Sequence, residues 1–507
     1  EAFCQVVGSS LIPNEFSLFS HQQRMLKKAM EGRHCVVVTG TGSGKTEAFL
    51  LPVIASIIRE AKSQKKPWKN VRAPNPRPWS RKNIPKWDDS RCDIRGEKRT
   101  PAVRALLLYP MNALVEDQVS RLRNALDSNS THTAMNETLG GNRIRFGRYN
   151  GSTPVAGHPF TLDTNGRPKK NSTKHSELRR GLKESIAQFE DLQKRIATAE
   201  REKIAAEGDS KRIAEAQKEL NILKEQCDFI PRMEAGASEM FHRWEMQANP
   251  PDLLITNVSM LSIMLMRNLH PSLTDDRADS MIFDKTKKWL SEDLENHVFH
   301  LVIDELHLYR GATGTEVAYL LRQLLDRLAL HPNSNQLRIL ASSASLDGES
   351  ESTYEFLAGM FGMAADEARK RFHIEDGELV YSTNLPKDND QNGFSNELSK
   401  KFLKIELLAQ QSQDPTSVVE EAADMLASEK HIIGVVSAFI DQEKQRFTAL
   451  SLPKLASKWF STLQSKDSQL AAARGLFMAL ARMSELEPSD IVLPRIRFHW
   501  MVKNING

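Results

Sequence analysis

Short apolar runs that end in glycine-rich or acidic segments recur along the first part of the chain. The run 35–38 leads into a segment rich in glycine, and a helical pattern follows at 47–51. A second run, 300–303, ends in two acidic residues. Continuous apolar runs of this length are typical of strands that are buried on both faces of a parallel sheet. The pattern predicts an α/β domain with a mostly parallel sheet and helices on both faces.

A glycine-rich loop connects the first predicted strand to the first predicted helix. Such a loop points backbone N–H groups and the positive end of the helix dipole into one concavity, which suits a polyphosphate. We expect Lys45 to contact the β- and γ-phosphates of ATP and the Thr46 hydroxyl to bind Mg²⁺. The strict pattern begins with glycine where this chain has threonine, so a glycine turn without a ligand is the alternative. The expected nucleotide-binding residues are Thr39, Gly40, Thr41, Gly42, Ser43, Gly44, Lys45 and Thr46.

Asp304 and Glu305 directly follow the second apolar run. Acidic residues at the carboxyl end of a buried parallel strand lie where α/β sheets bind ligands. In a nucleotidase with a phosphate loop, Asp304 would bind Mg²⁺, and Glu305 would orient and deprotonate the attacking water. An ion pair that caps the strand is the alternative. The phosphate loop upstream favours the catalytic interpretation.

Six segments, in order, resemble the motifs of superfamily 2 helicases and translocases of the DExH-box type. The segments are 19–22 (Phe-Ser-His-Gln), the phosphate loop 39–46, 107–118 (from Leu-Leu-Tyr-Pro), 255–257 (Ile-Thr-Asn), 304–307 (Asp-Glu-Leu-His) and 343–345 (Ser-Ala-Ser, where Ser-Ala-Thr is usual). The resemblance covers residues 16 to 346 and implies one RecA-like domain. It implies that Gln22 contacts the adenine and that His307 takes part in catalysis.

The same resemblance implies roles in coupling and in nucleic-acid binding. His307 and the segment Ser343, Ala344 and Ser345 would couple hydrolysis to movement. Because loops at the carboxyl ends of neighbouring strands share one sheet edge, one scaffold can sense both nucleotide and nucleic acid. For the residues at 109–111 a strand-ending turn is an equal alternative, since proline ends pairing. The implied nucleic-acid contacts are Tyr109, Pro110, Met111, Asn112, Thr256 and Asn257.

The arginine-bearing motif of the family, Q-x-x-G-R-x-G-R, does not occur in the sequence. In the family that motif lies on a second RecA domain and supplies an arginine to the transition state. We therefore expect the chain to be part of a longer protein that carries this second domain. Residues 1–507 alone should bind ATP better than they hydrolyse it.

A basic insert, 62–102, separates the phosphate loop from the next strand. Between Lys62 and Arg99 there are 13 Lys and Arg residues against 4 Asp and Glu residues, although the net charge of the chain is only +4. Trp68, Trp79 and Trp87 lie among them. Basic residues interleaved with aromatics suit single-stranded nucleic acid, whose bases stack on indole rings. The alternatives are an acidic partner surface, or a solvated loop whose tryptophans anchor it to the domain.

A second insert, 174–228, contains two runs of apolar residues at helical spacing around Gly208. It predicts an antiparallel helical hairpin, which would bind partner proteins, clamp nucleic acid or serve as a spacer.

We assign 1–348 to the RecA-like domain, 349–385 to a short strand-containing extension and 386–507 to a mainly helical accessory region.

Composition is that of an ordinary globular protein, with 40% hydrophobic and 26% charged residues. The four cysteines are far apart and have no C-x-x-C spacing, which fits a reducing cytoplasm and no zinc site. The most apolar long run, 253–266, is too short to span a bilayer. The sequence therefore predicts a cytoplasmic protein without a membrane segment.

The leading hypothesis is an ATP-dependent motor that moves along or unwinds nucleic acid, with DNA favoured over RNA. Segments 493–502, 309–311 and 112–114 resemble large bacterial helicases of phage-defence systems such as Druantia and DISARM. The alternative settings are DNA repair and general nucleic-acid metabolism. The alternative functions are a nucleotide-gated scaffold without processive movement and a motor that moves polypeptide; the basic insert disfavours the latter, because polypeptide lacks uniform phosphate charge.

Overall fold

The computed structural model describes residues 1–12, 17–38, 44–71, 99–206, 210–234, 236–268, 270–273, 277–343, 346, 348–376, 394–411, 414–426, 434–435, 438–441, 446–447 and 450–486. These residues form two compact units, which divide between Gly377 and Glu378. The first unit contains the central sheet, and the second is mainly helical. No helix within these ranges has the length and apolar character needed to cross a membrane.

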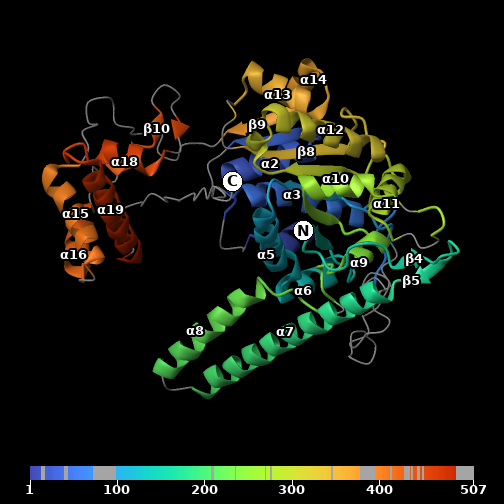
Figure 1. Cartoon of the computed structure of the whole chain (residues 1–507), viewed down its shortest axis with the longest axis horizontal. Helices are drawn as coiled ribbons and strands as arrows, with labels where there is room; N and C mark the ends of the chain where they lie inside the picture. Colours follow the sequence, from blue (N-terminus) through green and yellow to red (C-terminus); the bar gives the residue numbers. More distant parts are fainter. Residues whose placement is uncertain are drawn as a thin grey trace. The chain divides into compact units, whose positions relative to one another are not determined.

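Among the described residues, seven parallel strands form the central sheet of the first unit (Figure 1). Their order is β3-β6-β2-β7-β8-β1-β9, and each neighbouring pair is parallel. The predicted α/β class and mostly parallel sheet are therefore confirmed. The bounds are β1 (His34–Val38), β2 (Ala105–Tyr109), β3 (Phe146–Tyr149), β6 (Leu253–Asn257), β7 (Phe299–Ile303), β8 (Leu337–Ser343) and β9 (Phe372–Asp376).

Helices cover both faces of the sheet, because alternate side chains of each strand enter opposite hydrophobic cores. On β2, Leu106 and Leu108 enter one core, whereas Leu107 and Tyr109 enter the other. The first core is completed by α10 (Val258–Met266), α11 (Asp279–Glu292), α12 (Gly311–Arg327) and α13 (Glu351–Phe361). The second is completed by α1 (Ala2–Gly8), α2 (Ser20–Met30), α3 (Lys45–Ala61), α5 (Asn112–Asp127) and α6 (Asn129–Thr138).

We expected residues 349–385 to form an extension after the RecA-like domain, but their described part, 349–376, ends in a strand that completes the sheet of that domain. After α13 the chain forms α14 (Ala365–Arg371) and then β9. Strand β9 pairs with β1 from His34 opposite Phe372 to Val38 opposite Asp376. The local pattern predicted a strand here, but pairing with a strand near the N-terminus is a long-range property that the pattern does not reveal. The first compact unit therefore extends to Gly377.

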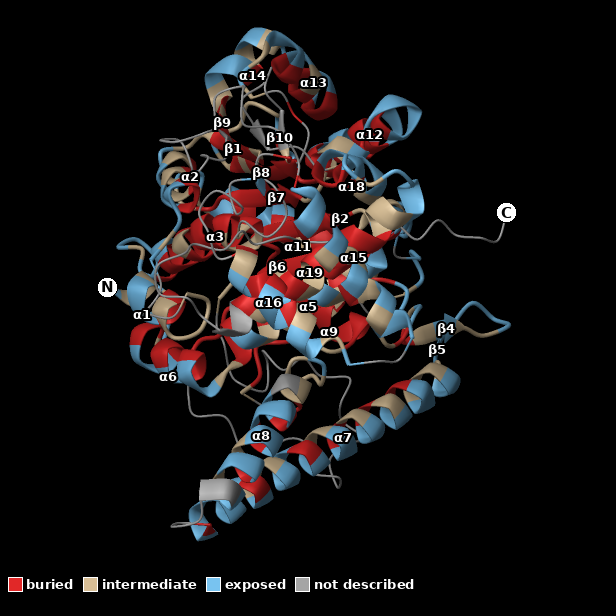
Figure 2. Ribbon diagram, turned by 90° about the vertical axis from the view of Figure 1, so that its left-hand side faces the viewer, coloured by how far each residue is buried: buried red, intermediate tan, exposed pale blue. Residues whose placement is uncertain are grey.

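The insert at 174–228 forms the predicted helical hairpin. Helix α7 (Ser172–Ala205) has 34 residues and packs against α8 (Ser210–Cys227). At 1.5 Å per residue α7 is about 51 Å long. Its first half packs on Trp244 of the short helix α9 (Arg243–Ala248), and its second half packs on α8. Exposed residues run along both helices (Figure 2). The small antiparallel pair β4 (Phe160–Leu162) and β5 (Pro168–Lys170) precedes the hairpin.

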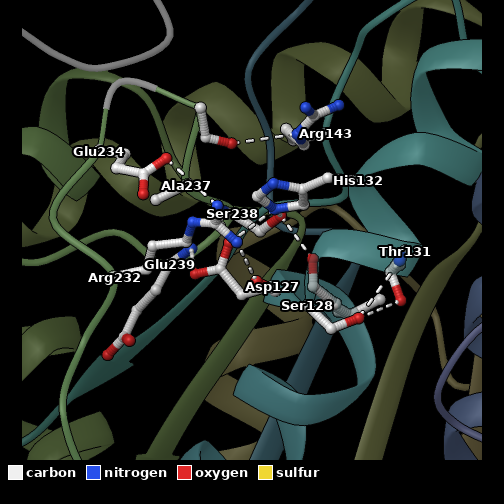
Figure 3. A network of polar contacts seen from close by, with 12 residues as sticks. Asp127, Ser128, Thr131, His132, Arg143, Arg232, Glu234, Ala237, Ser238 and Glu239 are labelled. Carbon is white, nitrogen blue, oxygen red and sulfur yellow. Dashed lines mark hydrogen bonds and ion pairs between the residues drawn. The ribbon is translucent and has the colours of Figure 1, made fainter. Parts of the chain in front are cut away.

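A buried polar network joins the base of this hairpin to the junction of α5 and α6 (Figure 3). Oδ1 of Asp127 lies 2.8 Å from His132 Nε2 and accepts a 2.6 Å hydrogen bond from the backbone N–H of Ser238. Burial alone would raise the pKa of Asp127, but these two hydrogen bonds hold it below its ordinary value. Arg123 donates to the carbonyl of Asp228, just after α8, at 2.9 Å. The hairpin is thereby tied to the helix that follows β2.

The described part of the second unit is mainly helical, as predicted. Its hydrophobic core is formed by α15 (Asn396–Gln410), α16 (Thr416–Leu426), α18 (Leu452–Trp459) and α19 (Lys466–Leu486), with a short antiparallel pair β10 (Ile440–Asp441) and β11 (Arg446–Phe447). Helix α19 crosses α15 closely at Gly475, where an added Cβ would overlap the carbonyl oxygen of Phe402. Glycine therefore permits this helix crossing.

Replacing Gly475 by alanine should destabilise the helical unit. The added methyl group meets backbone, which cannot move aside as a side chain can, so we expect a loss of about 2 kcal/mol. Gly359→Ala in α13 is the matched control, because its Cβ would enter open space; alanine there should stabilise by up to about 1 kcal/mol. Thermal unfolding followed by circular dichroism measures both. Equal effects of the two substitutions would contradict this account of the crossing.

Candidate nucleotide and nucleic-acid site

The predicted motif residues in the described part of the chain gather at one edge of the sheet. The strands are parallel, so all their carboxyl ends meet there. The register places Ile303 beside Leu108 and Ala341, and Tyr109 beside Asn257. The residues that follow these strands are consequently neighbours in space.

Glu305 lies between two basic side chains from different elements. Lys45 Nζ, at the start of α3, is 3.4 Å from Glu305 Oε1, and His307 Nδ1 is 3.3 Å from Glu305 Oε2. The lysine side chain is 9% exposed and the glutamate 20%. Both oxygens of this carboxylate therefore have a cationic or titratable partner. Lys45, Glu305 and His307, expected from the sequence to act together, are brought together by the fold.

Asp304 is held by a serine that sequence analysis did not select. The Ser342 hydroxyl donates to Asp304 Oδ1 and accepts a 3.0 Å hydrogen bond from the backbone N–H of Glu305. Burial raises the pKa of Asp304, and the neighbouring carboxylate of Glu305 adds to the rise, whereas Ser342 and Lys45 oppose it. A bound cation would favour the ionised form. The carboxylate oxygens of Asp304 and the hydroxyl of Thr46 are the ligand type that Mg²⁺ prefers.

Glu305 has a left-handed backbone, with φ 51° and ψ 48°. A residue other than glycine in this region costs about 1–3 kcal/mol and is held there only by its surroundings. The hydrogen bond from its N–H to Ser342 and the short helix η2 (Leu306–Leu308) that follows both fix this turn. With this backbone conformation, the Glu305 carboxylate lies 3.4 Å from Lys45 Nζ.

Gln22 supports the end of the phosphate loop. Its Oε1 accepts from the backbone N–H of Phe19 at 3.0 Å, and its Nε2 donates to the carbonyl of Gly44 at 3.0 Å. The residue is only 4% exposed. Gly44 has φ +74°, and a Cβ there would overlap Gln22 Nε2. Gln22 therefore positions the residue directly before Lys45, and its implied contact with adenine stays a prediction.

Part of the predicted site lies outside the described residues. These positions are Thr39, Gly40, Thr41, Gly42 and Ser43 of the phosphate loop, Ala344 and Ser345 after β8, and Trp79 and Trp87 of the basic insert. Thr46 is described as the second residue of α3, and Ser343 as the fully buried last residue of β8.

The implied nucleic-acid residues divide into exposed and buried ones. Met111 is 57% exposed, and Asn112 is also exposed. Asn257 donates to Asn112 Oδ1 at 2.6 Å and caps α10 through Met260 N. By contrast, Tyr109 is 4% exposed, and Thr256 is fully buried with its hydroxyl bonded to the Tyr149 carbonyl. The side chains of Tyr109 and Thr256 hold the edge together, whereas Met111, Asn112 and Asn257 lie where a ligand can reach them. Pro110 is half-buried between the two groups.

Trp68 anchors the start of the basic insert. Its indole N–H donates to Glu60 Oε1 at 3.2 Å, and the guanidinium of Arg99, at the other end of the insert, lies 3.8 Å from the ring centroid. Glu60 also accepts from the buried Arg104, which in turn pairs with Asp252. One face of the ring, to which a base would have to stack, is occupied by Arg99. The anchoring alternative therefore describes Trp68 better than the stacking prediction.

Residues 19–175 match the family of DEAD/DEAH box helicases. This span includes Gln22, Lys45 and the segment at 109–112, whose geometry is given above. The chain contains a DEAD/DEAH box helicase domain. The predicted family is thereby confirmed.

The curated proteins that resemble this helicase domain are much longer than the chain. The chain is 31% identical over 373 residues to the Druantia protein DruE of Escherichia coli, and the match covers 71% of the chain but 17% of that protein. It is 32% identical over 109 residues to the uncharacterized ATP-dependent helicase MJ1574 of Methanocaldococcus jannaschii, over 22% of the chain and 13% of that protein. The chain thus spans less than a fifth of either relative.

Two solved helicase structures are also similar. The crystal structure of the DUF1998 helicase MrfA bound to DNA and AMPPNP matches with 15% identity and a TM-score of 0.35, over 87% of this chain and 39% of that one. The DEAD-box helicase Mss116 bound to ssRNA and UDP-BeF matches with 13% identity and a TM-score of 0.34, over 80% and 50%.

Gly44→Ala should weaken ATP binding by the helicase domain. The substitution forces a strained backbone and displaces Gln22, and a cost of about 1.4 kcal/mol corresponds to a tenfold loss of affinity. Titration with a fluorescent ATP analogue measures it. Gly166→Ala is the matched control, since Gly166 has φ +72° but open space around its Cβ position. Unchanged affinity in Gly44→Ala would remove the role assigned to the Gln22 contact.

Trp68→Ala should lower stability without changing nucleic-acid affinity. Loss of a half-buried indole with its hydrogen bond should cost about 2 kcal/mol. Urea unfolding and single-stranded DNA binding at fixed salt test the two halves of this prediction. Weaker DNA binding with unchanged stability would instead restore the stacking prediction.

Proposed function

We propose that the chain is the N-terminal motor half of an ATP-dependent nucleic-acid helicase or translocase, with DNA favoured over RNA as its track. One observation carries the proposal: Glu305 lies between Lys45 and His307, at the sheet edge that also presents Asn112 and Asn257. The family match at 19–175 supports it.

Each residue of the nucleotide site has a chemical role in this proposal. Lys45 leaves Glu305 to bind the β- and γ-phosphates when ATP enters. Asp304 and Thr46 would hold Mg²⁺, which would neutralise charge on the phosphate oxygens. Glu305, released from Lys45, orients the attacking water and accepts its proton. The exchange of partners by Lys45 makes the position of Glu305 depend on the nucleotide.

The coupling step follows from the contacts of the same residues. His307 lies within 3.3 Å of Glu305, and Ser342 bonds both Asp304 and the Glu305 backbone. A change at Glu305 is therefore transmitted to η2 and to the end of β8. We infer that Ser342, next to the expected coupling segment 343–345, belongs to this pathway. The bond between Asn112 and Asn257 links the two loops that would contact nucleic acid.

A second RecA domain would complete the motor. It would supply the arginine that stabilises the transition state, so residues 1–507 alone should turn over ATP slowly. The chain spans 17% of the Druantia protein DruE, which leaves room for such a domain in a longer protein. The similarity to DruE also supports a setting in bacterial anti-phage defence. A cytoplasmic location fits this role.

The alternative function is a nucleotide-gated scaffold that binds ATP and partners without processive movement. The long, mostly exposed hairpin of α7 and α8 favours it, because such a surface can dock a partner protein. In this alternative hydrolysis is dispensable, and that difference separates the two functions.

Glu305→Gln in the full-length protein tests the motor. We expect ATP to bind and the hydrolysis rate to fall at least about 100-fold, because the proton acceptor is lost while Lys45 and Asp304 remain. Glu184→Gln, an exposed residue on α7, is the control. ATPase rates should be measured with single-stranded DNA, double-stranded DNA and RNA over a salt series, since phosphate contacts weaken steeply with salt. Biological activity that survives Glu305→Gln would exclude the motor and favour the scaffold.

A further inference from the structure

A row of arginines lies at the amino edge of the sheet, opposite the nucleotide site. The register pairs Cys35 of β1 with Leu340 of β8, and His34 of β1 with Phe372 of β9. Arg33 directly precedes β1, Arg338 is the second residue of β8, and Arg371, the last residue of α14, directly precedes β9, so Arg33 lies between Arg338 and Arg371. Neighbouring strands lie about 4.8 Å apart. Three guanidinium-bearing residues are therefore adjacent, and we call them, with Arg59 in the last turn of α3, the amino-edge arginine cluster.

Backbone carbonyls, not carboxylates, hold this cluster. Arg33 donates to the carbonyls of Arg371 at 3.2 Å and Phe372 at 2.8 Å, and Arg338 donates to the carbonyl of Leu337 at 2.7 Å. Arg371 donates to the carbonyl of Asn333. Within the described ranges, the closest carboxylate oxygen is Glu367 Oε2, 4.0 Å from Arg371 Nε. The guanidinium groups are thus oriented while their positive charge stays largely uncompensated.

The electrostatic effect of the cluster is visible at two side chains. Burial, then the charges of Arg59 and Arg371, lower the pKa of Arg338 to about 10. Burial, with Arg338, Arg371 and Arg33, lowers the pKa of His34 to about 3. His34 Nδ1 accepts from Ile339 N at 3.2 Å, so the imidazole is neutral and adds no charge of its own. Like charges held close together repel one another, and an anion between them would relieve the repulsion.

We propose that the amino-edge arginine cluster binds a phosphate group, at a site separate from the nucleotide site. Guanidinium groups present paired N–H donors that match the oxygens of a phosphate, and fixed donors bind it at little entropic cost. Arg33, Arg338 and Arg371 are half-buried and Arg59 is exposed, so an anion can reach them from solvent. The phosphate can belong to a small molecule or to a nucleic-acid backbone. The cluster lies at the amino ends of the parallel strands and Lys45 lies at their carboxyl ends, so the two sites are at opposite edges of the sheet.

Calorimetric titration of the 507-residue chain with inorganic pyrophosphate tests the proposal in a Lys45→Ala background, which removes the main phosphate contact of the nucleotide site. We expect one pyrophosphate per chain, and at least tenfold weaker binding in Arg338→Gln and in Arg59→Gln. Arg179→Gln on α7 is the control, because it removes the same charge from an exposed helix. Without pyrophosphate, Arg338→Gln should unfold at the same or a higher temperature, since charge repulsion is relieved. Arg59→Gln serves as a second variant that should fold normally, because the Arg59 side chain is exposed.

A parallel titration with a single-stranded DNA oligonucleotide identifies the source of the phosphate. If Arg59→Gln weakens DNA binding more than Arg179→Gln does, the ligand is a nucleic-acid backbone; if only pyrophosphate binding falls, it is a small phosphate. Either result supports the site. Absence of pyrophosphate binding, equal affinities in Arg338→Gln, Arg59→Gln and Arg179→Gln, or binding of poly-glutamate without pyrophosphate would overturn it. Because Lys45 is absent throughout, failure here leaves the proposed ATPase site untouched.

Discussion

Parallel pairing of β7 with β2 and β8 is the constraint on which the candidate site depends. It fixes Ile303 between Leu108 and Ala341, and so delivers Asp304 and Glu305 to the edge where α3 begins. If β7 shifted by one residue in this register, every side chain of β7 would turn toward the opposite core. The two hydrophobic cores, which together bury most of the apolar side chains of the strands, therefore also determine the geometry of the candidate site.

Glu305 can exchange partners when a ligand binds. Its strained backbone is held by Ser342, and its carboxylate is shared between Lys45 and His307. A lysine that pairs with a carboxylate before the ligand binds and with phosphate afterwards has an anionic partner in both states. The arrangement thus avoids leaving an uncompensated buried lysine, which would be costly.

Sequence reasoning was strongest where chemistry is local. Glycines before Lys45 and acids after a buried strand together indicate a nucleotide site, and the fold brings Lys45, Asp304, Glu305 and His307 together. It missed Ser342 because a serine inside a strand carries no motif, although the alternation of β8 places it on the same face as Asp304. It assigned Tyr109 and Thr256 to ligand contact because burial is not visible in a motif. The place of β9 depended on pairing between distant segments.

The two ends of the basic insert meet. Arg99 stacks on Trp68 and also binds Asp252, while Trp68 and Arg104 share Glu60 at the far end of α3. Because these contacts hold the two ends of the insert together, the arrangement of the sheet does not depend on the length of the chain between them. The segment 72–98 can therefore change in length or in sequence without moving Lys45, which lies at the other end of the same helix. The contacts among Trp68, Arg99 and Glu60 thus form a fixed attachment point, at which the domain can accept different recognition segments.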